Sequence, residues 1–470
     1  MIALTLDRIA EITQARLCGP ARPTDTVTGP VVIDSRQAGP GSLFVALGGE
    51  RVDGHDFADA AVAAGAAAVL GSRPVAVPQL LVDGGDDEVV AALGRLARAV
   101  AGELGDADII AVTGSSGKTT TKDLLAQVLG RLGPTIAPTG SFNNEIGHPL
   151  TVLRADADTR FIALEVAARG LGHIAHLCSV APPRIGIVLN VGSAHMGEFG
   201  SREAIAQAKG ELVAALPDAD AGGVAVLNAD DDAVIGMAER TRARVVSYGL
   251  AEDADVRARD VGLDGSGRAT FTLEIAGRSA GVRLALVGVH QVHNALAVAA
   301  AATELGMGID AIAAALSEAG PVSRWRMEVT ELNGGITVVN DAYNANPESM
   351  EAALRTLEAL AGQRRSFAVL GHMAELGGRS RAEHEDIGRL AAATGVETII
   401  AVGEEAAPIA DGARSVQAWQ GEVIRVFDAA EAAAALQGRL RPTDVVMVKG
   451  SRVAGLEQVV EQLACGEAAK

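Results

Sequence analysis

Aromatic residues are scarce in this chain: they make up 3% of its 470 residues, whereas hydrophobic residues of all kinds make up 49%. The cores must therefore be built from alanine, valine, leucine and isoleucine, which suits buried parallel sheets flanked by alanine-rich helices. Cysteine is also scarce, because Cys18, Cys178 and Cys465 are isolated and odd in number. Such a set predicts neither a disulfide framework nor a thiolate metal site.

Basic residues are fewer than acidic ones: the chain has 40 lysine and arginine residues and 59 aspartate and glutamate residues, which gives a formal net charge of −19. This balance argues against nucleic acid as a partner. No uncharged apolar run approaches the roughly 20 residues that span a bilayer, and the first residues lack the basic region and long apolar run of a signal peptide. We expect no membrane insertion, a cytoplasmic location and, because nothing indicates a coiled coil or an obligate interface, a monomer.

The clearest feature that is present is a phosphate-binding loop. Residues 109–121 read IIAVTGSSGKTTT, an apolar strand followed by a glycine-rich turn and a segment with helical spacing. Such a turn presents free N–H groups and a helix N-terminus to an anion, and its lysine offsets the anion's charge. A threonine hydroxyl after the lysine can bind Mg²⁺, although Val112 stands where the general pattern has glycine. The sequence predicts a nucleoside triphosphate site formed by Gly114, Ser115, Ser116, Gly117, Lys118, Thr119 and Thr120.

Short apolar strands alternate with helical patterns along the whole chain, which predicts an α/β protein. The length is typical of about three domains, and polar or glycine-rich stretches at 102–108 and 320–325 suggest where they meet. We expect a small N-terminal α/β domain at 1–103 and a central domain with a P-loop-type, mostly parallel sheet at 104–319. A C-terminal Rossmann-like domain should follow at 320–470.

Glu165 ends another apolar strand, at the edge where open α/β sheets bind their ligands. A carboxylate beside a phosphate loop is a natural ligand of Mg²⁺, which takes a few carboxylates together with phosphate oxygens and water. The alternative is a glutamate exposed at the strand end, and the residue alone does not decide between the two.

The TGSSGKTTTKD form of the loop resembles that of the Mur ligases, the family of ATP-dependent amide-bond-forming enzymes of peptidoglycan precursor synthesis. Five further segments resemble this family in the same order along the chain. They are DSRQAGPGSLFVALGGERVDGHDF (34–57), SFNNEIGHPLTVL (141–153), NVGSAHMGEFGSREAIAQAKGE (190–211), GVHQVHNALAVAAA (288–301) and NDAYNANPESM (340–350). The resemblance covers all three expected domains.

The resemblance implies a centre with two Mg²⁺ ions, bound by Thr119, Glu165, His195 and Lys209. In the family the lysine at this last position is carbamylated, which would turn a cation into an anion able to bridge metals. Lys118, Lys209 and His195 are therefore the expected catalytic residues. Without the resemblance, His195 would be read as a solvated loop histidine and Lys209 as an exposed helical lysine. The Val-Ala-Ala that follows Glu165 departs from the family pattern.

The resemblance also implies nucleotide contacts: Asn294 with the adenine, Arg326 with the phosphates and Asp341 with the ribose. Gln291 stands where the family more often has asparagine, so it is left out of this set. The N-terminal domain is expected to bind the uridine diphosphate. The substrate-binding residues expected in all domains are Ser35, Arg36, Asn143, Asn144, Tyr343, Asn344 and Asn346.

The form YNANPESM is similar to that of family members that join D-alanyl-D-alanine to UDP-N-acetylmuramoyl-tripeptide through an acyl phosphate. Nothing in the sequence indicates whether the third peptide residue is meso-diaminopimelate or lysine. There are three alternatives. One is a family member that adds a diamino acid, whose Asp-Asn-Pro-Arg signature is absent here; another is a folylpolyglutamate synthetase, which lacks the N-terminal uridine-binding domain; the third is a nucleotide-gated binding protein without turnover. We also expect the third domain to rotate about residues near 320–323 when it closes over the nucleotide.

Overall fold

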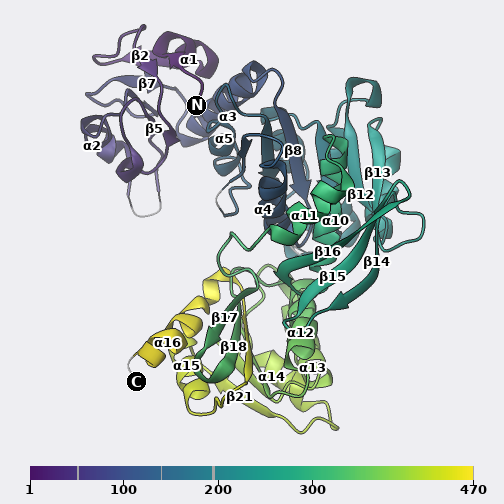
Figure 1. Cartoon of the computed structure of the whole chain (residues 1–470). Helices are drawn as coiled ribbons and strands as arrows, with labels where there is room; N and C mark the ends of the chain where they lie inside the picture. Colours follow the sequence, from purple (N-terminus) through teal and green to yellow (C-terminus); the bar gives the residue numbers. More distant parts are fainter. Residues whose placement is uncertain (50–51, 139, 193–195, 469–470) are drawn as a thin grey trace.

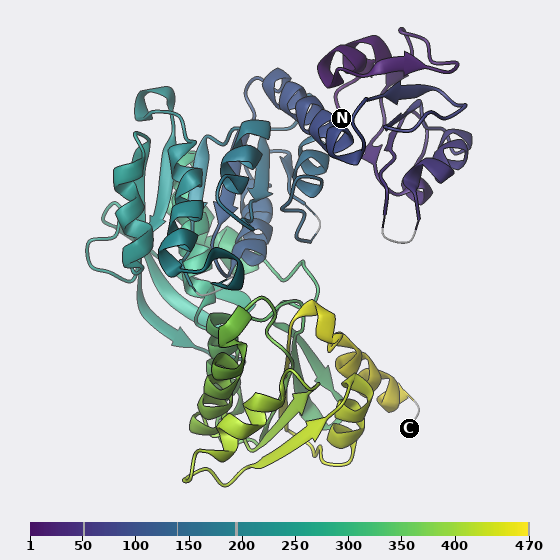
Figure 2. The same ribbon diagram turned by 180° about the vertical axis from the view of Figure 1, so that it is seen from behind.

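The computed structural model describes residues 1–49, 52–138, 140–192 and 196–468. It confirms the expected α/β class: three units, each with its own parallel-rich sheet, follow one another along the chain (Figure 1). The N-terminal unit flanks the central unit, and the C-terminal unit lies below the central unit in this view and in the reverse view (Figure 2). Among the described residues, no helix is long and apolar enough to cross a membrane.

The central sheet has the strand order β16-β15-β14-β13-β12-β11-β8-β10-β9. Its strands are β8 (Asp108–Thr113), β9 (Thr135–Ile136), β10 (Phe161–Glu165), β11 (Ile185–Val188), β12 (Val224–Asn228), β13 (Arg244–Gly249), β14 (Val256–Leu263), β15 (Arg268–Ile275) and β16 (Arg278–Val287). All neighbours from β9 to β14 pair in parallel, and only the last three strands form an antiparallel meander. This meander extends the parallel part of the sheet at one edge.

Helices cover both faces of the central sheet. Alternate residues of its strands point to opposite sides, and apolar side chains on both sides need to be covered. Ile110 and Val112 of β8 face one core, whereas Ala111 between them faces the other. The helices of this unit include α4 (Lys118–Leu129), α5 (Gly147–Val152), α6 (His173–Val180), α8 (Arg202–Ala214), α10 (Gln291–Glu304) and α11 (Ile309–Glu318). Helices α4, α10 and α11 contribute to the first core, and α6 and α8 to the second.

The C-terminal sheet has the order β17-β18-β22-β19-β20-β21, and all its pairs are parallel except the edge pair β17–β18. Its strands are β17 (Glu328–Leu332), β18 (Ile336–Asp341), β19 (Ser366–Leu370), β20 (Thr398–Val402), β21 (Glu422–Val426) and β22 (Val445–Lys449). Its helices are α12 (Pro347–Ala361), α13 (Ser380–Ala393), α14 (Ala407–Arg414), α15 (Ala429–Gln437) and α16 (Glu457–Ala468). Because β22 returns between β18 and β19, the carboxyl ends of these three strands meet.

The N-terminal sheet has the order β2-β7-β6-β5-β4. Its elements include α1 (Leu6–Thr13), β2 (Arg16–Cys18), β4 (Val31–Val32), β5 (Leu43–Val45), α2 (Ala58–Ala63), β6 (Ala68–Gly71), β7 (Gln79–Leu81) and α3 (Asp86–Glu103). Helix α3 joins this unit to the central one, since one continuous core contains Leu93 and Leu96 of α3 together with Leu164 of β10.

Candidate active site

The phosphate loop lies between β8 and α4, as the sequence predicts. Gly117 takes φ +82°, and a Cβ there would approach Asn294 Oδ1 to 2.5 Å, so the turn needs glycine at this position. Lys118 is the first residue of α4 and donates from Nζ to Gly114 O at 2.7 Å. Burial lowers the pKa of Lys118, against a smaller opposing effect of Glu165. The loop therefore holds a partly buried cation whose only hydrogen bond within the described chain is to a carbonyl.

Side-chain amides hold the loop in shape from two neighbouring elements. The Ser116 amide donates to Asn190 Oδ1 at 2.9 Å, and Asn190 follows β11. From α10, Asn294 accepts from Thr121 Oγ1 at 3.2 Å and donates to Gln291 Oε1 at 2.8 Å. The Asn294 side chain, expected at the adenine, thus also fixes α4 relative to α10.

Oxygen atoms gather beside the lysine at the end of β10. Glu165 is 2% exposed, and its two oxygens accept from Thr119 Oγ1 at 2.9 Å and from Asn143 Nδ2 at 2.7 Å. Ser141 Oγ lies 3.1 Å from Thr119 Oγ1. A buried carboxylate with only neutral hydrogen-bond donors leaves room for a cation, and carboxylate and hydroxyl oxygens are the ligands that Mg²⁺ prefers. These residues fit a magnesium ion.

The third unit contributes two expected nucleotide-binding residues to the cavity that the loop lines. Arg326 donates from Nη2 to Thr119 Oγ1 at 3.1 Å, and its guanidinium carbon lies 4.1 Å from the centre of the Tyr343 ring. Asp341, the last residue of β18, accepts from Lys449 Nζ at 2.5 Å. Burial lowers the pKa of Lys449, and the Asp341 carboxylate opposes that shift. Arg326 and Asp341 thus come within the same site as Lys118.

The linker between the second and third units is attached to α4. Gln127 forms two hydrogen bonds with the Gly320 backbone, at 2.9 and 3.0 Å. Farther along, the Ser323 amide donates to Asp123 Oδ2 at 3.2 Å. The rotation expected about residues 320–323 stays a prediction, and in this structure the third unit already contacts the phosphate loop.

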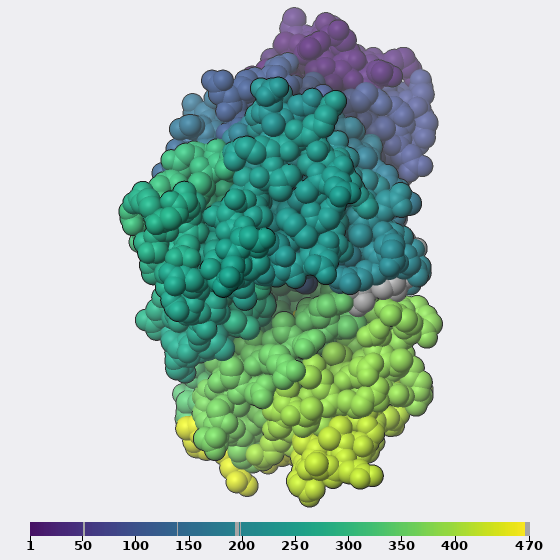
Figure 3. Space-filling view, turned by 90° about the vertical axis from the view of Figure 1, so that its right-hand side faces the viewer, coloured from purple at the N-terminus to yellow at the C-terminus, as the bar shows by residue number. Residues whose placement is uncertain are grey.

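A cavity of about 800 Å³ lies between the central and C-terminal units, and a groove follows the boundary between these units on the surface (Figure 3). Residues expected in the site that line the cavity are Ser115, Ser116, Gly117, Lys118, Thr119, Thr120, Asn143, Glu165, Asn294, Arg326, Asp341, Tyr343, Asn344 and Asn346. Gly114, Asn144, Lys209, Ser35 and Arg36 are not in its wall. His195 lies outside the described residues. Asn144 instead accepts from the Gly147 amide at 2.9 Å, at the start of α5.

Lys209 lies inside the central unit, on α8, and is 5% exposed. The pKa of Lys209 is lowered to about 7, mainly by burial and to a smaller extent by the nearby Lys118 cation. The reading of Lys209 as an exposed helical lysine is therefore wrong. The spacing of Ile205, Lys209 and Leu212, at i, i+4 and i+7, could have predicted its burial from the sequence.

The N-terminal unit holds Ser35 and Arg36 in a short 3-10 helix after β4. Arg36 is bonded to Asp34, with Nη2 2.6 Å from Oδ2, and these hydrogen bonds lower the pKa of the Asp34 carboxyl to about 2. The Arg36 side chain is 88% exposed, so its remaining surface is open to a ligand.

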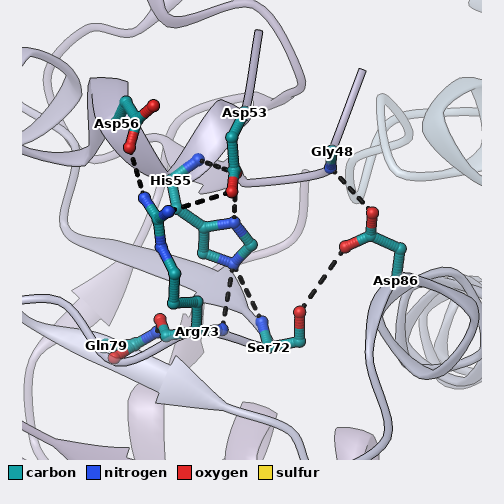
Figure 4. Close-up of polar contacts among 8 residues, drawn as sticks. All are labelled: Gly48, Asp53, His55, Asp56, Ser72, Arg73, Gln79 and Asp86. Carbon is teal, nitrogen blue, oxygen red and sulfur yellow. Dashed lines mark hydrogen bonds and ion pairs between the residues drawn. The ribbon is translucent and has the colours of Figure 1, made fainter. Parts of the chain in front are cut away.

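A polar cluster in the same unit supports its loops (Figure 4). His55 is buried; its Nδ1 lies 2.7 Å from Asp53 Oδ1, and its Nε2 accepts from the amides of Ser72 at 3.0 Å and Arg73 at 3.1 Å. With both ring nitrogens occupied, His55 connects the segment before α2 to the one after β6.

Among the cavity residues of the third unit that the predicted set left out are two basic side chains, Lys449 and Arg452. Lys449 ends the apolar strand β22, so the strand-end rule that pointed to Glu165 also applied to it. Arg452 lies in the loop that follows, and no general motif marks its role.

The comparisons with known proteins agree with this geometry. Three family models match: "Mur ligase family, catalytic domain" at residues 30–101, "Mur ligase middle domain" at 112–302 and "Mur ligase, glutamate ligase domain" at 325–452. The chain belongs to the Mur ligase family. This Mur ligase is 50% identical over 503 residues to the UDP-N-acetylmuramoyl-tripeptide--D-alanyl-D-alanine ligase of Mycobacterium tuberculosis, with 98% of each chain covered. It is 36% identical to the Escherichia coli protein of the same name, over 98% of this chain and 99% of that one.

Solved structures give the same result. A crystal structure of MurF from Acinetobacter baumannii superposes with a TM-score of 0.87 and 31% identity, covering 98% of this chain and 99% of that one. A MurF ligase from Thermotoga maritima in complex with ADP has a TM-score of 0.80 and 30% identity, with 94% of this chain and 99% of that one covered. The fold of this Mur ligase is thus shared with full-length relatives.

Proposed function

We propose that this Mur ligase joins D-alanyl-D-alanine to UDP-N-acetylmuramoyl-tripeptide with cleavage of ATP to ADP and phosphate, in the cytoplasmic synthesis of peptidoglycan precursors. Relatives that match over nearly their whole length carry the name of this activity. The observation that carries the proposal is the cavity itself, in which the phosphate loop with Lys118 faces Arg326 and Asp341 of the third unit. Two substrates and a nucleotide can meet there.

The reaction proceeds in two steps. A terminal carboxylate oxygen of the tripeptide attacks the γ-phosphorus of ATP, the bond to the β-phosphate oxygen breaks, and an acyl phosphate and ADP result. The amine of D-alanyl-D-alanine then attacks the acyl carbon, phosphate leaves, and the nitrogen loses a proton as the amide forms. Lys118 and Arg326 supply positive charge where the phosphoryl group is transferred, and positioning with electrostatics does most of the catalysis.

Magnesium belongs to this proposal. Thr119 and Glu165 would bind one ion beside Lys118. Their oxygens lie 2.9 Å apart, and the Glu165 carboxylate is buried, so both could contact the same ion. When bound, Mg²⁺ would offset the charge of the phosphate oxygens. We propose that His195 and Lys209 take part in a second site.

Carbamylation of Lys209 is supported by its burial. An amine whose pKa is about 7 is partly neutral at physiological pH, and only the neutral amine can attack CO₂. The ammonium group first loses one proton; the neutral nitrogen then bonds to the carbon of CO₂ and loses a second proton, so that a cation becomes an anion that can bind metal. With ¹³C-labelled bicarbonate, we expect a carbamate carbon signal in the wild-type NMR spectrum that Lys209→Met lacks. Identical spectra would contradict the carbamate.

Substrate contacts and domain roles complete the proposal. Residues 1–103 bind the uridine nucleotide through Ser35 and Arg36, residues 104–319 form the ATPase domain with Asn294 at the adenine, and residues 320–470 form the ligase domain. Further substrate contacts are Asn143, Asn144, Tyr343, Asn344 and Asn346. We propose that the protein acts as a monomer, since one chain contributes both walls of the cavity.

Release of ADP tests the proposed activity. With ATP, Mg²⁺ and UDP-N-acetylmuramoyl-tripeptide, we expect sustained turnover only when D-alanyl-D-alanine is added, and a product whose mass equals that of both substrates less one water. Lysine or a diamino acid in its place should not support turnover. Turnover with a diamino acid, or none with any amine, would overturn the assignment.

A further inference from the structure

The third unit has a ligand-binding sheet edge with basic residues beyond those expected to bind the nucleotide. The carboxyl ends of β18, β22 and β19 lie side by side, and open α/β sheets bind ligands at such a place. Asp341 ends β18 and Lys449 ends β22, and these two side chains bind each other. The loop that follows β22 carries a further cation, Arg452, which lines the same cavity as Lys118.

Arg452 is held in place from two sides. Its guanidinium carbon lies 4.1 Å from the centre of the Trp325 ring, and Nη1 donates to Glu457 Oε1 at 2.6 Å. Trp325 has φ +58°, a region that non-glycine residues rarely adopt, and its amide donates to Glu328 Oε2 at 3.1 Å. Nε and Nη2 of Arg452 form no hydrogen bond with the described part of the chain. The guanidinium is thus oriented while two of its nitrogens stay available.

Most other cations around the cavity already have partners. Lys118 belongs to the phosphate loop, Arg326 donates to Thr119, and Lys449 donates to Asp341 and to Asn344 O. The whole chain carries a net charge of −19, so its general field repels an incoming carboxylate. A carboxylate that enters the cavity therefore needs a local cation with free donors.

The second substrate of the proposed reaction carries such a carboxylate. D-alanyl-D-alanine is a zwitterion, and its two ends are at most about 7 Å apart because an extended residue spans about 3.5 Å. Its amine must reach the acyl carbon near the phosphate loop. Its carboxylate must then meet another wall of the same cavity, and a planar guanidinium binds a carboxylate through parallel hydrogen bonds.

We propose that Arg452, oriented by Trp325 and Glu457, binds the terminal carboxylate of D-alanyl-D-alanine. The proposal rests on the proposed function, since that function supplies the dipeptide. The free Nε and Nη2 groups of Arg452 receive the carboxylate, while the Trp325 ring packs against the guanidinium. Recognition of the free carboxylate makes a dipeptide with a blocked C-terminus a poor substrate.

Arg169 is the competing residue. It also lines the cavity, and both side chains are exposed, but that of Arg169 forms no hydrogen bond with the described residues, whereas Arg452 is stacked on Trp325 and paired with Glu457. A mobile arginine must lose more side-chain freedom on binding than one already stacked and paired. The structure therefore favours Arg452.

A comparison of two substrates in two enzymes tests the assignment. ADP release is measured with D-alanyl-D-alanine and with D-alanyl-D-alaninamide, in which the charge is removed, for the wild type and for Arg452→Ala. The wild type should prefer the free acid in kcat/KM by on the order of 10- to 100-fold, the range of one charge-assisted hydrogen-bonded pair. Arg452→Ala should lose most of this preference through a raised KM for the dipeptide, with the KM values of ATP and the uridine substrate unchanged.

The controls separate this role from a general one. Arg439→Ala removes an arginine that is also paired with a glutamate, Glu422, at 3.1 Å, and should behave as the wild type. Arg452→Lys retains the charge and should keep part of the preference for the free acid, which also covers the case in which Arg452→Ala does not fold.

An undiminished preference in Arg452→Ala, or a preference lost in Arg169→Ala instead, would overturn the assignment. So would a wild type that uses acid and amide equally well. Failure of the proposed function would look different, because the wild type would then release no ADP in response to either dipeptide.

Discussion

Replacing Lys118 by methionine should lower activity without lowering stability. In the structure Lys118 is partly buried, its ammonium group donates to Gly114 O at 2.7 Å, and its pKa is lowered by desolvation. A desolvated cation without a bound anion costs folding free energy, so a neutral side chain of similar length should leave the unfolding temperature equal or higher. Loss of its charge at the transferring phosphoryl group should reduce turnover by ~10²–10³.

Lys122 provides the control, because it lies one turn farther along α4 and is fully buried but paired with a carboxylate. Its ammonium group binds the Asp123 carboxylate and donates to Pro138 O at 2.8 Å. Lys122→Met leaves a largely buried carboxylate without its cation, which typically costs about 3 kcal/mol or more. This variant should therefore unfold at a lower temperature, while its residual folded enzyme keeps the phosphate loop's own lysine.

Thermal unfolding and ADP release on both variants complete the comparison. Nucleotide at 100 times its dissociation constant should stabilise the wild type by about 2.7 kcal/mol, and Lys118→Met should gain less at the same concentration. Turnover of Lys118→Met within tenfold of the wild type would refute the reasoning. So would a loss of stability in Lys118→Met as large as that in Lys122→Met.

Three further changes test other parts of the site. Glu165→Gln should raise the Mg²⁺ concentration for half-maximal ADP release by at least about tenfold, and an unchanged Mg²⁺ dependence would exclude Glu165 as a ligand. The pKa of Lys209 is lowered from 10.5 to about 7 in the folded protein. Between these two pH values the unfolded chain binds a proton that the folded chain does not. The cost of the buried charge to the free energy of unfolding is therefore full below pH 7 and disappears as the pH rises toward 10.5. Lys209→Met in CO₂-free buffer should therefore raise the unfolding temperature more at pH 6.5 than at pH 10, and an equal effect at both would contradict the buried amine. Gln127→Leu removes both bonds to Gly320 and should increase the radius of gyration in small-angle scattering, whereas an unchanged profile would show that these bonds do not hold the third domain.

Much of the site was predictable where local rules apply. The strand–turn–helix around Lys118 follows from glycine and lysine spacing, and Glu165 follows from its place at the end of an apolar strand. The start of α12 also follows local rules, because Asn346 and Ser349 form a capping box and Pro347 occupies the first helical position. These features depend on residues close together in the sequence.

The rest depends on contacts between distant segments. The bond from Arg326 to Thr119 spans 207 positions, and the attachment of Gly320 to Gln127 spans 193. Neither follows from periodicity or from turn chemistry. The strands β17 and β21 are also hard to predict, because both lie at sheet edges and are less buried than the strands between them. Edge strands lack the continuous apolar run that marks a buried parallel strand.

Transfer of an oxygen isotope tests the central claim most directly. The terminal carboxylate of UDP-N-acetylmuramoyl-tripeptide is labelled with ¹⁸O and turned over with ATP and D-alanyl-D-alanine. An acyl phosphate requires that one labelled oxygen leave with the inorganic phosphate while the other stays in the new amide. We expect phosphate that carries one ¹⁸O per turnover, and unlabelled phosphate released at the same rate as the amide product would contradict the account.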